Sequence, residues 1–269
     1  MPDVYSHGHH ESVLRSHVWR TAENSAAYLL PTLGPGLDLL DVGCGPGTIT
    51  RELAALVHPG RVVGVDASEE AIREANRLHA GLDPAADNVS FVTADVYDLE
   101  FEEATFDVVH AHQVLQHLSE PVRGLRSMLR VTKPGGVVAV RDGDYAAFAW
   151  APLDPLLDRW MELYHRICRA NGGEADAGRF LLGWVQQAGF VDATATSSTW
   201  TFADPQRRAW WGGLWADRVE QSSFADHAIA YGLSDRTELE RIAAAWRRWS
   251  EQPDGFFAVV HAEVLARRP

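Results

Sequence analysis

A glycine-rich loop between a strand-like run and a helix-like run constrains the fold more than any other feature of this chain. Residues 37–43 (LDLLDVG) form a short apolar run, and residues 48–57 (TITRELAALV) follow with helical spacing. Gly43, Gly45 and Gly47 lie at this junction, where glycine lets the backbone turn tightly and lets a ligand approach without a Cβ in the way. The next helix presents its positive N-terminal end to that ligand. The pattern predicts a strand, a turn and a helix that together bind a small molecule.

The same plan repeats along the first half of the chain. Residues 61–66 read as a second strand that stops at Asp66, and Ser68 is placed to cap a helix over residues 69–80. Because apolar strand-like runs alternate with helix-like runs, we expect a parallel sheet covered by helices on both faces. Further strands are expected at residues 88–96, 105–113 and 133–144, and a further helix at residues 119–132.

The alternation of strand-like and helix-like runs stops after Asp144. Residues 145–172 and 203–252 are helical in tendency and rich in aromatic residues, so we expect them to be two insertions that form a lid. A helix over residues 177–190 and strands over residues 191–202 and 255–266 are expected to complete the sheet. With no repeat or low-complexity linker, we expect one integrated domain, made of a helical arm (1–35), a ligand-binding core (36–145) and the rest of the sheet with its lid (146–269).

The charge of the chain argues against two classes of partner. The formal net charge is −13 and Lys and Arg form no cluster in the sequence, whereas nucleic acids and anionic membranes are bound by clustered positive charge. The N-terminus is polar, and no apolar run approaches the roughly 18 residues of a membrane-spanning helix. We therefore expect a cytoplasmic protein that binds neither nucleic acid nor membrane. Cys44 and Cys168 lie far apart, which fits a reducing compartment and gives no metal-binding spacing.

Two common nucleotide-binding loops do not match the glycine loop. A dinucleotide fingerprint requires a third glycine, or an alanine, at position 48, where this chain has Thr48; the last loop glycine, Gly47, comes one place earlier. A Walker loop requires a Gly-Lys-Ser/Thr sequence, which the loop lacks. These differences count against a nicotinamide-dependent oxidoreductase, which stays open as an alternative.

Five motifs stand in an order and at a spacing typical of one enzyme family. They are LLDVGCGPGTIT, VVGVDAS, VTADV, FDVVHAHQVLQHL and KPGGVV, within residues 37–140. In these motifs the chain resembles the class I S-adenosylmethionine-dependent methyltransferases, in the small-molecule branch that includes the ubiquinone and menaquinone C-methyltransferases. The resemblance implies an α/β fold, Rossmann-like and doubly wound, with a mostly parallel seven-stranded sheet and helical lid insertions after strand 5 and between strands 6 and 7. It also implies S-adenosyl-L-methionine as the cofactor and S-adenosyl-L-homocysteine as the product.

The resemblance further implies a set of cofactor contacts. Asp66 would accept hydrogen bonds from both ribose hydroxyls, with a solvated turn as the alternative. Asp95, beside Val96, would accept from the exocyclic amine of adenine, with helix capping as the alternative. Asp41 would bind the ammonium at the methionine end or orient the glycine loop, and Cys44 is expected to be a packing residue. The full set is Asp41, Gly43, Gly45, Gly47, Asp66, Ala67, Ala94, Asp95, Val96, His112, Gln113, His117 and Arg20.

Three histidines fall within eight positions, at His110, His112 and His117. Alternate residues of a strand share a face, so His110 and His112 are expected to point the same way. No Cys or paired carboxylate with ligand spacing stands nearby, so we expect no metal. The resemblance places the end of the fourth strand beside the sulfonium, which makes His112 the first candidate for a general base. His117 would be a packing residue or a cofactor contact.

A base is needed only when the methyl acceptor must lose a proton. Asp142 and Asp144 follow the fifth strand at the ligand-binding edge, although RDGD is equally good turn chemistry. In related enzymes an N-terminal arm folds over the cofactor, which makes Tyr5, His10 and Arg20 candidate contacts, with a frayed surface helix as the alternative. The predicted catalytic set is His112, Asp142 and Tyr5.

The aromatic residues of the expected lid bear on the substrate. Trp211 and Trp215 share a helix face, and most such stripes belong to a core. If they line a pocket opposite Tyr145, Phe148 and Trp150, the pocket suits a flat, apolar ring. We therefore expect methyl transfer to C, N or O of a small aromatic or heteroaromatic product of secondary metabolism, with an indole, phenol or quinone-like ring.

Other functional classes stay open or are disfavoured. A catalytically silent S-adenosylmethionine-binding protein would keep the same cofactor motifs, so it stays open. A nucleic-acid methyltransferase is disfavoured, because HAHQ stands where such enzymes carry an Asn-Pro-Pro-Tyr-type motif after strand four. A homodimer is allowed, and the sequence fixes neither the acceptor atom nor the oligomeric state.

Overall fold

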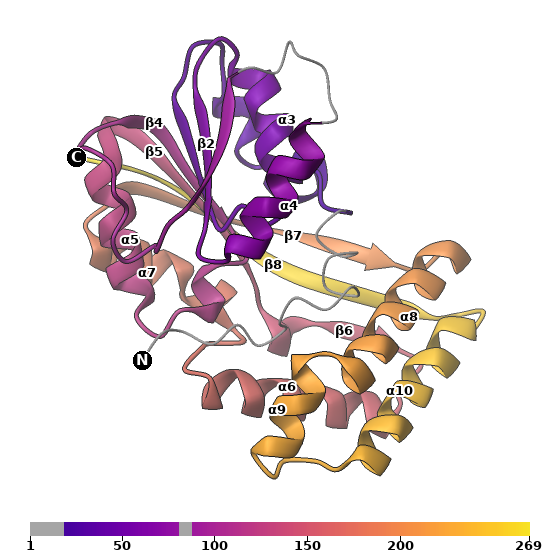
Figure 1. The fold of residues 1–269 in the computed structure, drawn as a ribbon. Helices are drawn as coiled ribbons and strands as arrows, with labels where there is room; N and C mark the ends of the chain where they lie inside the picture. The colour runs from indigo at the N-terminus through magenta and orange to yellow at the C-terminus, as the bar shows by residue number, and fades with distance from the viewer. Residues whose placement is uncertain (1–18, 81–87) are drawn as a thin grey trace.

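A computed structural model describes residues 19–80 and 88–269 and shows an α/β fold around one mixed sheet (Figure 1). The sheet order is β3-β2-β1-β4-β5-β8-β6, and β7 pairs with the free side of β8. The first five strands are parallel to one another, and β8 is antiparallel to its neighbours. The Rossmann-like, mostly parallel fold that the sequence predicted is confirmed. The strands are β1 (Leu39–Val42), β2 (Val62–Asp66), β3 (Val89–Thr93), β4 (Phe106–His112), β5 (Thr132–Gly143), β6 (Ala149–Ala151), β7 (Val191–Phe202) and β8 (Phe256–Arg267).

Helices cover both faces of the sheet, as Figure 1 shows, with α3 and α4 on one side and α5 and α7 on the other. Helices α2 (Ala22–Ala26) and α3 (Thr48–Val57) pack Ala26 and Leu53 against Val108 of β4. Helices α5 (Pro121–Val131) and α7 (Leu181–Ala188) pack on the opposite face of β4 and β5. The remaining helix of the core is α4 (Glu69–Ala80), and short 3-10 turns are η1 (Leu30–Thr32), η2 (Leu115–His117), η3 (Tyr145–Ala147) and η4 (Ala177–Phe180).

Local sequence signals set most helix boundaries. Helices α3 and α4 span the residues that the sequence predicted. Asp154, Asp204 and Asp235 each accept a backbone N–H at the start of a helix in the second half of the chain, which satisfies a donor that the helix itself leaves unpaired. Helix α7 ends at Ala188, and the next residue, Gly189, has a left-handed φ of 107°. Glycine commonly follows the last helical residue in this conformation, because it has no Cβ.

The second half of the chain builds a group of four helices beyond the carboxyl end of β5, in the segments where the sequence predicted a lid, and we call this group the lid. Helices α6 (Pro155–Ala170), α8 (Pro205–Gln221), α9 (Ser223–Ala230) and α10 (Arg236–Glu251) gather at the end of the molecule to which β7 and β8 extend (Figure 1). Strand β8 pairs with β5 through residues 261–267 and with β6 through residues 256–258. The short β6 is an eighth strand beyond the seven predicted, because residues 256–260 of β8 extend past the end of β5 and leave an edge with which β6 pairs.

The tryptophans of the lid form a second hydrophobic core. Trp160, Trp215 and Trp246 are fully buried, and the ring centroids of Trp160 and Trp215 lie 4.5 Å apart. Trp211 is buried in the same cluster. Of the two roles weighed for Trp211 and Trp215, the structure supports the packing role. Within residues 19–80 and 88–269, no helix combines the length and the apolar character needed to cross a membrane.

Candidate functional site

The glycine loop lies where the carboxyl end of β1 meets the first turn of α3. Gly43, Gly45 and Gly47 all have positive φ, at 69°, 54° and 74°. A Cβ on Gly43 would come within 2.3 Å of Val114, and one on Gly47 within 2.5 Å of the Phe91 ring. Both distances are shorter than Cβ contacts allow, so the loop keeps this shape only with glycine at these two positions.

Asp66 joins the loop to the end of β2. Its Oδ2 accepts from the backbone N–H of Gly45 at 3.0 Å, and its Oδ1 accepts from the backbone N–H of Ser68 at 2.9 Å. The side chain is half-buried, and Ala67 beside it is exposed. These two bonds hold the Asp66 carboxylate between the glycine loop and the start of α4.

The segment after β3 lies beside Asp66. The backbone N–H of Ala94 donates to the carbonyl of Asp66 at 3.1 Å. Asp95 is exposed, and its Oδ1 accepts from the backbone N–H of Tyr97 at 2.9 Å, while Val96 is buried. The turn therefore fixes the direction of the exposed Asp95 carboxylate.

Asp41 is committed to contacts within the protein. The residue is buried, its Oδ2 accepts from the Thr50 hydroxyl at 2.5 Å, and its Oδ1 pairs with Nδ1 of His110 at 2.7 Å. These contacts tie β1 to the first turn of α3 and to β4. Of the two roles predicted for Asp41, they favour orientation of the loop over direct contact with a ligand ammonium.

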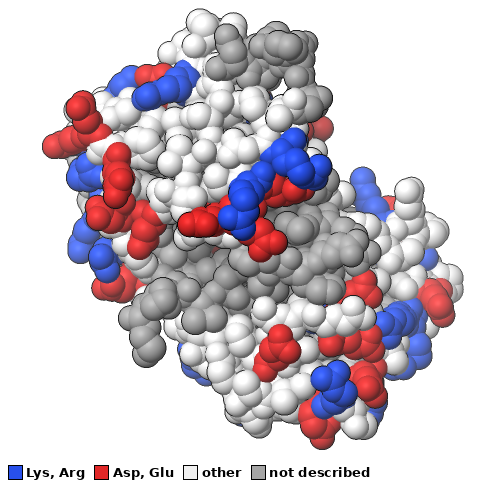
Figure 2. Space-filling view, viewed as in Figure 1, with Lys and Arg blue, Asp and Glu red and all other residues white. Residues whose placement is uncertain are grey.

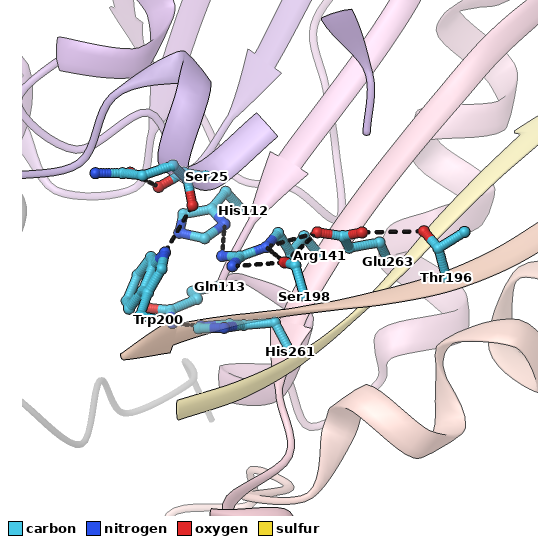
Figure 3. A network of polar contacts seen from close by, with 10 residues as sticks. Ser25, His112, Gln113, Arg141, Thr196, Ser198, Trp200, His261 and Glu263 are labelled. Carbon is cyan, nitrogen blue, oxygen red and sulfur yellow. Dashed lines mark hydrogen bonds and ion pairs between the residues drawn. The ribbon is translucent and has the colours of Figure 1, made fainter. Parts of the chain in front are cut away.

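His112, the last residue of β4, and Gln113, which follows it, lie in a polar cluster with Arg141 and His261 (Figure 3). His112 is buried, and its Nδ1 lies 3.4 Å from Nη1 of Arg141. Gln113 has a φ of 54°, accepts from Arg20 Nη2 through Oε1 at 2.5 Å, and donates from Nε2 to Nε2 of His261 at 2.9 Å. The structure therefore brings together three of the predicted residues: Arg20, His112 and Gln113.

Sequence reasoning missed the partners of this cluster. Arg141 is buried with Glu263, and its Nε lies 3.1 Å from Oε1 of that carboxylate. Burial lowers the pKa of the Arg141 guanidinium to about 10, while the charge of Glu263 acts to raise it. Trp200 covers the guanidinium, with its ring centroid 4.9 Å from Cζ. The available signal was a charged residue at an inward position of an apolar strand, in AVRDG and in VVHAEV.

Asp142 lies within β5 rather than after it as predicted, whereas Asp144 follows the strand, and the two aspartates have different surroundings. Asp142 is fully buried, and its Oδ1 accepts from the backbone N–H of Gln116 at 3.1 Å. Its Oδ2 has no hydrogen-bond partner within the described residues, and burial raises its pKa to about 7. Asp144 instead forms an ion pair with Arg179, with Oδ2 2.8 Å from Nε. Asp142 is therefore the aspartate available for chemistry.

The remaining predicted residues lie at the edge of the site or outside the described chain. His117 is half-buried and its Nε2 lies 3.0 Å from Nε2 of Gln116. Cys44 is buried in a small cluster with Phe91, as the packing prediction expected. Tyr5 and His10 lie outside the described residues.

The surface and the polar clusters bear on ligand classes. On the face seen in Figure 2, Lys/Arg and Asp/Glu side chains of the described residues are interspersed, without a broad basic surface. Residues 19–80 and 88–269 contain no group of three or more His, Cys, Asp or Glu side chains placed to hold a metal ion.

Comparisons with known proteins point to one family. The family profile described as "Methyltransferase domain" matches residues 33–189. The chain is 35% identical to an uncharacterized methyltransferase of Schizosaccharomyces pombe over 98% of this chain and 96% of the relative. It is 36% identical to a demethylmenaquinone methyltransferase of Clavibacter sepedonicus over 57% of this chain and 56% of the relative. Among solved structures, the YcgJ protein of Bacillus subtilis superposes with a TM-score of 0.59 at 19% identity, covering 92% of this chain and 99% of that one.

Proposed function

The chain belongs to the class I S-adenosylmethionine-dependent methyltransferases, and from that premise we propose that it methylates a C, N or O atom of a small aromatic or heteroaromatic natural product. The observation that carries the proposal is the convergence of the glycine loop, Asp66 and the end of β4 at one edge of the sheet. This edge lies at the point where the strand order reverses between β1 and β4, the usual ligand position of such folds.

The proposed cofactor contacts follow from the geometry of that edge. The glycine loop gives the methionine end of S-adenosylmethionine close access to backbone. Asp66, half-buried and held by two backbone N–H groups, would accept from the ribose hydroxyls. Asp95, whose carboxylate is exposed, would accept from the adenine amine, with Val96 against the ring. The bound cofactor supplies an activated methyl group, so the task left to the chain is to position the acceptor and handle its proton.

The proposed substrate class rests on the aromatic wall beside the end of β4. The ring centroid of Trp200 lies 5.8 Å from that of His112, and Trp19 packs edge-on against Trp200 at 5.1 Å. Flat apolar walls with polar tips suit an aromatic ring that carries hydroxyl or carbonyl groups. A relative named as a quinone methyltransferase supports the same class.

Asp142 is the proposed general base for acceptors that must lose a proton. Its Oδ2 is free of protein partners within the described chain, and a pKa of about 7 suits proton transfer near neutral pH. The acceptor's proton would pass to Oδ2 as the acceptor's lone pair forms the new bond to the methyl carbon and S-adenosylhomocysteine leaves.

Calorimetric titration tests the proposal. Wild type should bind S-adenosylmethionine with micromolar affinity, and Asp66→Ala should bind about tenfold to a hundredfold more weakly, because charge-assisted hydrogen bonds are lost. Asp254→Ala, at an exposed carboxylate, is the control and should bind like wild type. Tight binding of NADH without a response to S-adenosylmethionine would overturn the assignment.

A turnover assay tests the substrate class. Incubation with S-adenosylmethionine and a panel of phenols, quinols and indoles should give S-adenosylhomocysteine and a product heavier by one methylene, as seen by mass spectrometry. Cofactor binding without methylation of any aromatic acceptor, but with methylation of aliphatic amines, would contradict the aromatic class.

A further inference from the structure

A row of polar side chains crosses the sheet from the end of β4 to β7. We call it the polar row; it consists of His112, Arg141 and Glu263, which are buried, Ser198, which is half-buried, and Thr196, which is exposed (Figure 3). His112 is in register with Arg141, Arg141 with Glu263, and Glu263 with Thr196. Residues in register on adjacent strands share a face, so these side chains meet although they come from four different strands.

Arg141 determines which nitrogen of His112 carries the proton. A guanidinium has five N–H donors and no acceptor. Its Nη1 lies 3.4 Å from Nδ1 of His112, so a proton on Nδ1 would face a positive donor. Nδ1 must therefore be the bare, accepting nitrogen, and the neutral imidazole must carry its proton on Nε2.

The surroundings also keep the imidazole neutral. Burial, followed by the positive charge of Arg141, holds the pKa of His112 well below its ordinary value. Arg141 keeps its charge because Glu263 pairs with it, and Glu263 is in turn held by the hydroxyls of Ser198 and of Thr196, the latter at 2.9 Å. The row thus presents a neutral histidine rather than an imidazolium.

The Nε2 atom of His112 is buried and has no hydrogen-bond partner within the described residues. A buried donor that stays unpaired destabilises the folded protein, so such an atom points to a ligand or an ordered water. His110, on the same face two residues earlier, has the opposite arrangement, because its Nδ1 faces the Asp41 carboxylate at 2.7 Å and must carry the proton.

We propose that Arg141 is a positioning residue that fixes His112 as a hydrogen-bond donor, and that the Nε2–H of His112 binds an oxygen of the methyl acceptor. The inference rests on the proposed function and narrows its substrate class to acceptors with a phenolic or carbonyl oxygen at or beside the methylated atom. Such an oxygen gains negative charge as the acceptor loses its proton, and a fixed donor stabilises that charge without having to reorient. His112 would then not be the base, which leaves that role to Asp142.

The tautomer is measured directly by long-range ¹H–¹⁵N NMR on protein with ¹⁵N-labelled histidine. Wild type should show His112 protonated at Nε2 and His110 protonated at Nδ1, assigned with His112→Gln and His110→Gln. The double variant Arg141→Met/Glu263→Gln removes both buried charges together, which avoids leaving one charge unpaired. In it, His112 should become a mixture of tautomers while His110 stays unchanged. A wild-type His112 protonated at Nδ1, or an unchanged His112 in the double variant, refutes the positioning role.

Kinetics with a phenolic acceptor test the contact to substrate. His112→Leu should lower kcat/KM about tenfold to a hundredfold, the size expected for one buried hydrogen bond to a charged oxygen. His112→Gln keeps an N–H donor and should recover part of that loss. Both variants should keep the acidic limb of the pH profile. Loss of that limb in His112→Gln would make His112 the base and overturn the proposal.

Binding experiments separate this inference from the proposed function. Addition of the phenolic acceptor with S-adenosylhomocysteine should shift the Nε2 resonance of His112 in wild type. An unshifted resonance would mean that water alone pairs with Nε2, which contradicts the substrate contact. Failure to bind S-adenosylmethionine would instead refute the proposed function, while the tautomers of His110 and His112 would still be measurable.

Discussion

At the scale of single residues, Asp142 and Asp144 have the same side chain but different surroundings, which give the two carboxylates different roles. The Asp144 carboxylate is neutralised by Arg179, whereas Asp142 lies among backbone N–H groups of Leu115 and Gln116, with Arg141 and Arg20 exerting weaker effects. Burial outweighs these contacts and raises the pKa of Asp142 to about 7. The ionised form of Asp142 is therefore costly in the folded protein, and a group poised in this way is able to take up a proton.

Replacing Asp142 with Asn should remove part of the pH dependence of stability. Between pH 6 and pH 8 the folded wild type must ionise Asp142, whereas the unfolded chain, with an ordinary pKa of 3.8, is already ionised. At this site the folded state thus binds more protons, so the contribution of Asp142 to stability falls by about 1.4 kcal/mol as pH rises over this interval. The lowered pKa values of buried His112 and His261 act in the opposite direction, so the effect of Asp142 is measured as a difference between proteins. Urea denaturation at the two pH values should give a change in stability with pH that is more favourable by about 1.4 kcal/mol in Asp142→Asn than in wild type or in Asp144→Asn. The same change in all three proteins would contradict the raised pKa.

The same substitution should affect catalysis. With a phenolic acceptor, kcat/KM of wild type should fall below about pH 7, because protonated Asp142 cannot accept a proton. Asp142→Asn should lose about a hundredfold or more in kcat and should also lose this acidic limb, while its affinity for S-adenosylmethionine stays within about twofold of wild type. A retained limb in Asp142→Asn would assign the base to another group.

At the scale of elements, the bounds that depend on local sequence signals were predicted, whereas the pairing of strands that are distant in sequence was not. The bounds of α3, α4 and β7 were predicted from helical spacing, caps and alternation, all of which are encoded within about a dozen neighbouring residues. The position of the glycine loop between β1 and α3 was predicted for the same reason, since strand, loop and helix are consecutive in sequence. The contact of Arg141 with Glu263 joins residues 122 apart in sequence and depends on the register of β5 with β8. Register is set by packing of whole strands, so neither this pair nor β6 was predicted.

Gly47 tests the junction between β1 and α3. Gly47→Ala would strain a φ of 74° and place a Cβ 2.5 Å from the Phe91 ring, whereas Gly135→Ala meets the same φ with open space around it. The strain alone should cost about 1 kcal/mol in each variant, and the clash should add about 1–3 kcal/mol for Gly47→Ala. Thermal denaturation and calorimetry should show the larger loss of stability, with weaker S-adenosylmethionine binding, only in Gly47→Ala. Equal effects of the two substitutions would show that Phe91 moves away freely.

At the scale of the whole molecule, β8 joins the cofactor-binding core to the lid. Its residues 261–267 pair with β5 in the core, and its residues 256–258 pair with β6 beneath the lid helices. Phe257 of β8 is fully buried in the tryptophan cluster, with Trp246 at a ring distance of 5.3 Å. We propose that core and lid unfold as one cooperative unit, because one continuous strand supplies both hydrophobic cores.

Substitution of the two adjacent phenylalanines of β8 tests this unit. Phe257→Ala removes a fully buried ring and should cost about 3–5 kcal/mol, whereas Phe256→Ala, at a ring that is 40% exposed, should cost below about 1 kcal/mol.

Tryptophan fluorescence reports on the lid, because every tryptophan except Trp184 belongs to the lid cluster or packs against it. Hydrogen exchange of the slowest amides in β1 and β4 reports on the distant core. If core and lid form one cooperative unit, Phe257→Ala lowers the free energy of unfolding by the same amount whether it is measured by tryptophan fluorescence or by hydrogen exchange. A lid that melts earlier while the β1 and β4 amides keep their wild-type protection would make the lid a separate unit, able to open over the substrate without cost to the core.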